Sequence, residues 1–289
     1  MMTSILALWA FMGPSITLSP DIESVDKIVR HGSALFVLDR SSHLVTKTSD
    51  QGDLINIYDR RGEGPGEFYK LTGLSVVGNE VFLCDFNGKL IVTDLDLNFL
   101  REQKVDLRIW DLEATERGFY LVGFSGSSQK MVSFFDRDFK EIKTFGDPLK
   151  SSPKGYHFDN GRLIQYSGHF YFVHFFVLGV QVFSSDGGLD YISYPPHIED
   201  YESALLFSGA GKNLDASRAI KKVSCTRSGV ICLYKRKDEL DGWEAIRFSI
   251  ETQKWLAPVN DPMVVVSDLA HDYTISRDEQ DRIRLTVQP

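Results

Sequence analysis

Two aspartates and a histidine end apolar segments of similar pattern, and their side chains are of kinds that bind metal ions. The segments 34–39, 80–85 and 169–174 end in Asp39, Asp85 and His174. Carboxylate oxygens suit Ca²⁺, and carboxylates with imidazole suit Zn²⁺. If the segments surround a common axis, their ends could hold calcium or zinc there. The alternative is that these are solvated loop residues, and we predict no other cofactor.

No pattern in the chain predicts nucleophilic or metal-hydrolase catalysis. There is no Gly-x-Ser-x-Gly motif, and the seven histidines show no His-x-His or His-Glu-x-x-His spacing. Cys84, Cys225 and Cys232 lie inside apolar strand segments rather than in an activating setting. Catalysis is therefore not the chemistry that the residues themselves favour.

Several charged and aromatic residues are of kinds that recognise peptides and sugars. Together with Asp39, Asp85 and His174, the candidate binding residues are Arg40, Arg60, Arg61, Glu63, Glu67, Trp110 and Asp111. Within this set, the glycines and proline of 62–66 predict a sharp turn. We expect Glu67 to accept hydrogen bonds from backbone N–H groups there, and Phe68 to pack between neighbouring units.

One apolar strand pattern that recurs six times must position these residues. Its copies are 34–39, 80–85, 118–123, 169–174, 229–234 and 271–276. Self-similarity at about 40–60 residues without a helical period is typical of a blade repeated around an axis. Each copy has a partner strand before it and a second hairpin after it, which makes four antiparallel strands per unit.

The two ends of the chain predict how the ring closes. The sixth unit ends after its third strand, and residues 15–19 precede the first unit with no partner of their own. We therefore predict an all-β fold, a six-bladed β-propeller of four-stranded antiparallel blades, formed by residues 15–289 as one domain. The N-terminal strand completes the last blade and removes its open edges. Residues 195–219 are an insertion, which is either a lid, a binding loop or decoration, and in which 199–207 could form a short helix.

The topology predicts where the candidate residues meet. Loops between the second and third strands of each blade lie at the same end of the ring as the blade-to-blade crossovers, and this end would gather all ten candidates and the insertion. We expect a non-enzymatic scaffold that binds a peptide, a protein or a carbohydrate there. The alternative is a propeller-type lyase or hydrolase with an axial metal held by Asp39, Asp85 and His174.

The segment 62–68, at the first blade junction, resembles the Gly-x-Gly-Pro-Gly-Glu-Phe segment of bacterial six-bladed propellers of the NHL and TolB-like type. The blade pattern extends this resemblance, more loosely, over about residues 15–289. The resemblance implies a propeller fold and an exported binding or interaction protein without a uniform activity. The other blade junctions lack the motif.

Composition bears on the partners. The formal net charge is −8, from 32 basic and 40 acidic residues, and the only basic clusters are 221–222 and 235–237. A chain of this sign repels phosphate backbones, so we predict no nucleic-acid partner. We expect a monomer.

The N-terminus bears on localisation. Residues 5–12 form an apolar run too short to span a bilayer, with the apolar region of a signal peptide but no basic start or clear cleavage site. If residues 1–14 are an export signal, the protein is periplasmic, extracellular or envelope-associated, and otherwise it is cytoplasmic. No other apolar run reaches the length of a membrane span, so we expect no transmembrane segment in the mature chain.

The cysteines make no disulfide framework. Cys225 and Cys232 flank a predicted hairpin turn at 227–229. They are therefore either a cross-strand disulfide or two thiols of the core.

Overall fold

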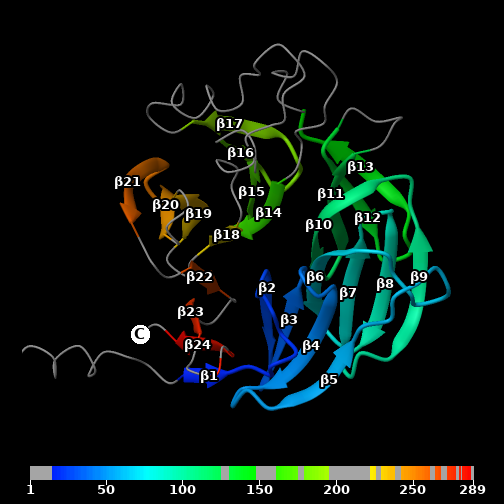
Figure 1. Ribbon diagram of the computed structural model, residues 1–289. Helices are drawn as coiled ribbons and strands as arrows, with labels where there is room; N and C mark the ends of the chain where they lie inside the picture. The colour runs from blue at the N-terminus through cyan, green and yellow to red at the C-terminus, as the bar shows by residue number, and fades with distance from the viewer. Residues whose placement is uncertain are drawn as a thin grey trace, which may run out of the picture.

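The computed structural model describes residues 15–124, 130–147, 161–174, 179–194, 222–225, 229–237, 242–260, 264–267, 272–277, 280 and 282–287. Among these residues all regular secondary structure is β, in six four-stranded antiparallel sheets. The sheets stand around a central axis, as Figure 1 shows. The predicted six-bladed β-propeller is confirmed.

Each blade places its first strand beside the axis and its last strand at the rim (Figure 1). The first three blades comprise β2 (Lys27–His31), β3 (Ala34–Asp39), β4 (Leu44–Ser49), β5 (Leu54–Tyr58); β6 (Leu71–Val77), β7 (Glu80–Asp85), β8 (Lys89–Asp94), β9 (Phe99–Lys104); and β10 (Arg108–Thr115), β11 (Gly118–Phe124), β12 (Val132–Asp136), β13 (Glu141–Phe145). The other three comprise β14 (Gly161–Tyr166), β15 (His169–His174), β16 (Val180–Phe183), β17 (Leu189–Ser193); β18 (Lys222–Cys225), β19 (Val230–Lys237), β20 (Gly242–Ser249), β21 (Lys254–Asn260); and β22 (Val264–Ser267), β23 (Asp272–Arg277), β24 (Ile283–Val287) with β1 (Ser15–Thr17).

The N-terminal strand completes the sixth blade, as predicted. β1 pairs antiparallel with β24, with Ile16 opposite Leu285, and the Leu18 N–H donates to the Ile283 carbonyl at 2.8 Å. Figure 1 shows this junction of the blue and red ends of the chain. Ile16, Leu18 and Leu285 are buried in an apolar cluster that also includes Val37 of the first blade. The strand therefore both closes the sixth sheet and seals it against the first.

Apolar side chains between neighbouring blades form the core. Fully buried phenylalanines fill successive interfaces around the ring, namely Phe36, Phe119, Phe172 and Phe248. Successive side chains of a strand point to opposite faces of the blade, and each face packs against one neighbouring blade. Both faces of a blade are therefore apolar. This explains why the sequence pattern of the second strand in each blade is an almost continuous apolar run.

The segment 62–68 forms the predicted sharp crossover between the first two blades. The Gly64 N–H donates to Glu67 Oε2 at 2.8 Å. Phe68 is buried, and its ring stacks on Tyr58 with the centroids 6.0 Å apart. Gly64, Glu67 and Phe68 thus have the structural roles expected of this motif.

Crossovers and the turns between second and third strands meet at one end, which we call the loop-rich end. Arg61 of the first crossover donates a hydrogen bond to the carbonyl of Ser42 in the β3–β4 turn. The Phe86 N–H of the β7–β8 turn donates to the Lys70 carbonyl of the same crossover at 2.9 Å. These contacts place the loops of the first two blades together, as the topology predicted.

The strand register contradicts a disulfide between Cys225 and Cys232. Cys225 lies opposite Ile231, and Ser224 lies opposite Cys232, so the register does not pair the two cysteines across the hairpin. The disulfide alternative is therefore wrong. Cys84 is a buried core thiol whose pKa burial raises to about 12.

Two sequence expectations lie outside the described residues. These are the apolar segment 1–14 and the insertion 195–219 with its predicted helix. In the part of the chain that the structure describes, no helix is long and apolar enough to cross a membrane.

Candidate ligand-binding site

The inner strands of the first and third blades exchange charged contacts at the axis. Lys27 begins β2, and its Nζ lies 2.8 Å from Glu113 Oε2 and 3.0 Å from the Leu112 carbonyl oxygen on β10. The same Nζ lies 3.9 Å from Asp111 Oδ1. One lysine from the first blade is thus surrounded by acceptors of the third blade.

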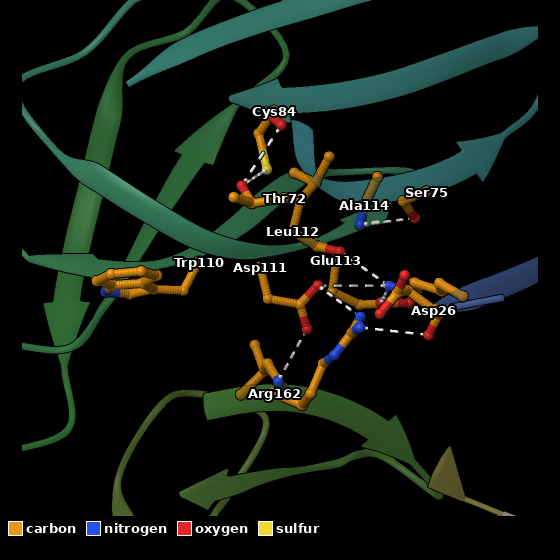
Figure 2. A network of polar contacts seen from close by, with 12 residues as sticks. Asp26, Thr72, Ser75, Cys84, Trp110, Asp111, Leu112, Glu113, Ala114 and Arg162 are labelled. Carbon is orange, nitrogen blue, oxygen red and sulfur yellow. Dashed lines mark hydrogen bonds and ion pairs between the residues drawn. The ribbon is translucent and has the colours of Figure 1, made fainter. Parts of the chain in front are cut away.

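Arg162 on β14 of the fourth blade joins this network. Its Nη1 donates to Asp111 Oδ1 and its Nη2 to the Asp26 carbonyl, both at 3.3 Å, as Figure 2 shows. Asp111 is fully buried and also accepts the Leu163 N–H at 3.3 Å. The axial network of Lys27, Asp111, Glu113 and Arg162 therefore links the first, third and fourth blades with paired charges.

Burial changes the protonation of Glu113. Loss of solvation raises the pKa of this carboxyl above its ordinary value, while the positive charge of Lys27 acts in the opposite direction. The network therefore holds the Asp111 carboxylate between two cations, whereas the charge of Glu113 is disfavoured.

Arg40, a predicted binding residue, lies beneath the loops. Its guanidinium donates to the carbonyls of Thr72 and Trp110, the latter at 3.0 Å. Thr72 in β6 and Trp110 in β10 are each the residue at which the strand register shifts, and the two positions are equivalent in their blades. Burial, with the nearby Arg162 charge, lowers the pKa of Arg40 to about 10. Arg40, from the first blade, therefore binds the bulged inner strands of the second and third blades.

The Asp39 carboxylate accepts hydrogen bonds from the backbone of two loops at the end of β3. Its Oδ2 accepts the N–H groups of Glu23 and Ser24 at 2.7 and 3.0 Å. Its Oδ1 accepts the N–H groups of Ser41 and Ser42 at 2.8 and 3.0 Å. Burial alone would raise its pKa, but the hydrogen bonds from Ser42, Ser24 and Glu23 outweigh burial and hold the pKa below its ordinary value.

Asp85 has the same role in the second blade. Its Oδ2 accepts the Tyr69 N–H at 2.8 Å, and its Oδ1 accepts the N–H groups of Asn87 and Lys89 at 2.7 and 3.2 Å. Both carboxylates therefore have their acceptor positions taken by different loops. The suggested axial calcium or zinc site does not fit them, and no group of three or more His, Cys, Asp or Glu side chains among the described residues could hold a metal ion. His174 ends β15, and its side chain lies outside the description.

At the loop-rich end, two cations and an indole surround one phenylalanine. Lys70 Nζ lies 6.0 Å and Arg108 Cζ 5.8 Å from the ring centroid of Phe86. The Trp110 ring meets Phe86 nearly edge-on, at 4.7 Å and 64°. We call Lys70, Phe86, Arg108 and Trp110 the Phe86 cluster. Lys70 ends the first crossover, Phe86 lies in the β7–β8 turn, and the other two lie on β10.

The cations of the Phe86 cluster are exposed, and neither lies within 4.0 Å of a carboxylate among the described residues. Next to Lys70, Tyr69 keeps 68% of its surface exposed. Of the predicted residues only Trp110 belongs to this cluster. Lys70 and Arg108 each lie two residues before the register shift of their strand, at Thr72 and Trp110 respectively. An alignment of the two blade junctions in the sequence would therefore have shown that Lys70 and Arg108 occupy equivalent positions.

The remaining predicted residues lie in the first crossover and contact other groups. Arg60 lies over the ring of Phe99, with 6.0 Å from Cζ to the centroid. Arg61 binds the Ser42 carbonyl, and Glu63 is exposed. The structure thus divides the predicted set between the axis, the loop backbone and the Phe86 cluster.

Comparison with known proteins supports the fold. A family model described as a six-bladed β-propeller matches residues 17–188. No curated protein matches the chain. A candidate exported protein from Bacteroides fragilis NCTC 9343 has a TM-score of 0.68 at 14% identity, covering 96% of this chain and 94% of its own.

Two further solved structures are similar. A member of the DUF4221 family from Bacteroides vulgatus ATCC 8482 has a TM-score of 0.61 at 8% identity, over 96% of this chain and 97% of its own. Hydrazine synthase from Kuenenia stuttgartiensis has a TM-score of 0.56 at 12% identity, over 89% of this chain and 75% of its own. At these identities the likeness shows the fold alone.

Proposed function

This chain belongs to the DUF5128 family of six-bladed β-propellers, and we propose that it is an exported, non-enzymatic scaffold that binds a ligand at the loop-rich end. The ligand is a peptide, a protein or a carbohydrate. The Phe86 cluster with Tyr69 is the proposed contact surface, and of the ten residues predicted from sequence it includes Trp110.

One observation carries this proposal: two cations that have no ion pair among the described residues share one aromatic ring, and an exposed tyrosine directly precedes one of them in the chain. Lys70 and Arg108 both lie over Phe86, and Tyr69 is 68% exposed. Aromatic side chains and arginine dominate the energetics of binding surfaces, because they bury large areas and supply directed charge. Such a surface can hold a ligand without any reacting group.

No specific observation on the described residues supports the alternative, a lyase or hydrolase with an axial metal. Asp39 and Asp85 bind loop backbone, and at the axis Lys27 and Arg162 both pair with Asp111. Hydrazine synthase shares the fold, but one fold hosts many functions and does not favour an enzyme here.

The proposal also includes export of the protein and its relationship to other propeller families. A candidate exported protein shares the fold, and the apolar run 5–12 has the character of a signal-peptide core. The segment 62–68 supports a closer relationship to NHL and TolB-like propellers, and we expect a monomer. N-terminal sequencing of the protein recovered from an exporting host tests the location: a mature chain that starts after cleavage supports export, and an intact Met1 contradicts it.

Charge reversal at the two ends of the ring tests the binding site. The K70E/R108E variant reverses two cations at the loop-rich end. Its matched control, R117E/K140E, makes the same change at exposed residues of the β10–β11 and β12–β13 turns, at the opposite end. Both variants should melt close to the wild type, because the altered side chains are exposed.

The binding measurement uses a panel of defined glycans and synthetic peptides with biolayer interferometry. A ligand that binds the wild type should bind R117E/K140E equally and K70E/R108E at least about tenfold more weakly. Binding that is unaffected by K70E/R108E, or lost equally in both variants, would contradict the proposed site.

A further inference from the structure

We infer that the Phe86 cluster recognises a carboxylate-bearing polysaccharide, of the uronate class, through its two cations and the exposed Tyr69 ring. This inference rests on the proposed function and names its ligand chemistry. Four observations on the described residues support it. Lys70 and Arg108 share one ring without an ion pair, they occupy equivalent positions in neighbouring blades, Tyr69 is exposed, and the backbone groups of the cluster are already hydrogen-bonded.

The cluster differs from other cations of this protein in how its charges are arranged. Some exposed cations pair with a carboxylate, as Lys130 does with Asp147 at 2.7 Å, and others, such as Arg117 and Lys140, have no ion pair among the described residues. Lys70 and Arg108 instead share one ring and have no carboxylate within ion-pair distance among the described residues. An anion that approaches the Phe86 ring therefore meets two positive charges, on a chain whose net charge is −8.

The cations repeat with the blade. Lys70 precedes the irregularity of β6 by two residues, and Arg108 precedes that of β10 by two. Two neighbouring blades thus offer the same charge at the same place. A polymer with an acid group on each unit matches this arrangement better than a ligand with one acid.

An exposed tyrosine adjoins Lys70 in the chain. Tyr69 is 68% exposed, and its backbone N–H donates to Asp85 Oδ2 at 2.8 Å. An exposed tyrosine ring offers a flat apolar face to a ligand. The C–H face of a pyranose can pack on such a ring.

Backbone groups of the cluster are already paired, which argues for a sugar over a peptide. Phe86 N–H donates to the Lys70 carbonyl at 2.9 Å, and Ile109 N–H donates to the Phe86 carbonyl at 3.2 Å. Peptides in extended form are commonly held by free backbone groups of a strand edge. Here the side chains must make the contacts, and they match carboxylates and ring faces.

The test compares three polymers on the full chain: oligogalacturonate, the same oligomer fully methyl-esterified, and poly-L-glutamate. We expect the wild type and R117E/K140E to bind oligogalacturonate, with weaker binding as salt rises. K70E/R108E should bind at least about tenfold more weakly, and the charge-conserving K70R/R108K should retain binding. Tyr69→Ala should weaken binding and Tyr69→Phe should not. The esterified oligomer, which keeps the rings and loses the charge, should not bind.

Each other outcome overturns the inference. Binding of poly-L-glutamate but not of oligogalacturonate would make the ligand an acidic peptide and leave the binding scaffold standing. Equal binding of the esterified oligomer would remove the requirement for charge. Failure of both acidic polymers overturns the inference alone, because the ligand panel tests the proposed function separately. Oligogalacturonate binding that K70E/R108E leaves intact overturns the site in both proposals.

Discussion

Lys27 on β2 of the first blade reaches the Glu113 carboxylate on β10 of the third blade, with 2.8 Å between Nζ and Oε2. These strands belong to blades that do not follow one another in the ring, so the pair spans the axis. Arg162 makes the corresponding link from the fourth blade through Asp111. Because paired charges occupy the axis at this level, we assign ligand recognition to the loop-rich surface above the inner strands.

Replacing Asp111 by Asn should destabilise the protein. The Asp111 carboxylate is fully buried and pairs with Arg162 at 3.3 Å. Removing one partner of a buried ion pair leaves the other charge uncompensated, at a cost of about 3–5 kcal/mol. Urea unfolding should show this loss in D111N. K130M, which removes the exposed pair with Asp147, should change the free energy of unfolding by less than about 1 kcal/mol, and equal effects of the two variants would contradict the account.

Replacing Glu113 by Gln should leave the protein at least as stable at pH 7. Burial raises the pKa of this carboxyl above 4.5, so its contribution to stability is present below that pH and is lost as pH rises through the folded-state pKa. At pH 7 the charged form is disfavoured, and a neutral glutamine removes that cost while still accepting a hydrogen bond from Lys27. The free energies of unfolding of E113Q and wild type should converge below about pH 4.5. An E113Q variant clearly less stable at pH 7 would show that the Lys27 pair outweighs burial.

Replacing Asp39 by Asn should cost stability in a pH-dependent way. The amide would turn an NH₂ group toward backbone N–H donors that now bind a carboxylate, and hydrogen bonds to charged groups contribute about 1.5–3 kcal/mol. Because the hydrogen bonds lower the pKa of Asp39, its contribution is fully present above the ordinary value of 3.8 and is lost as pH falls through the folded-state pKa. Unfolding curves of both proteins from pH 7 downward should therefore converge at acid pH. A difference that stays constant would point away from the charge.

Replacing Gly73 by Ala should loosen the packing of the second and third blades. A Cβ there would lie 2.7 Å from Cys84 Sγ and 2.8 Å from the backbone nitrogen of Leu112 on β10. Overpacking of this kind costs about 1–3 kcal/mol, because backbone must move. Gly188→Ala, in an exposed turn where a Cβ meets only small side-chain groups at 3.1 Å or more, is the control and should cost less than about 1 kcal/mol. Thermal melts that rank the two variants in the opposite order would contradict this packing.

Much of the ring is readable from the sequence. The bounds predicted for 34–39, 80–85 and 169–174 agree with β3, β7 and β15, because continuous apolar runs between turn residues leave little freedom. The closure by β1 was also predictable, because in the sequence the sixth unit lacks a fourth strand and residues 15–19 have no partner of their own.

The candidate site was less predictable. Strand-end acids such as Asp39 and Asp85 occur at equivalent positions whether they bind a ligand or cap a loop, because both roles place a carboxylate where a strand ends. Lys27 and Glu113 are 86 residues apart, and sequence does not show which side chains of the inner strands meet at the axis. Lys70, Phe86 and Arg108 come from three different segments, and only their packing reveals that they share one ring.

Hydrogen exchange measured with saturating oligogalacturonate shows whether the ligand binds at the loop-rich end. We expect slower exchange at 69–70, 86–88 and 106–110, with no change at the opposite turns 115–118 and 137–140. Protection confined to those opposite turns, or binding that leaves the exchange of the Phe86 cluster unchanged, would contradict a binding site at the loop-rich end.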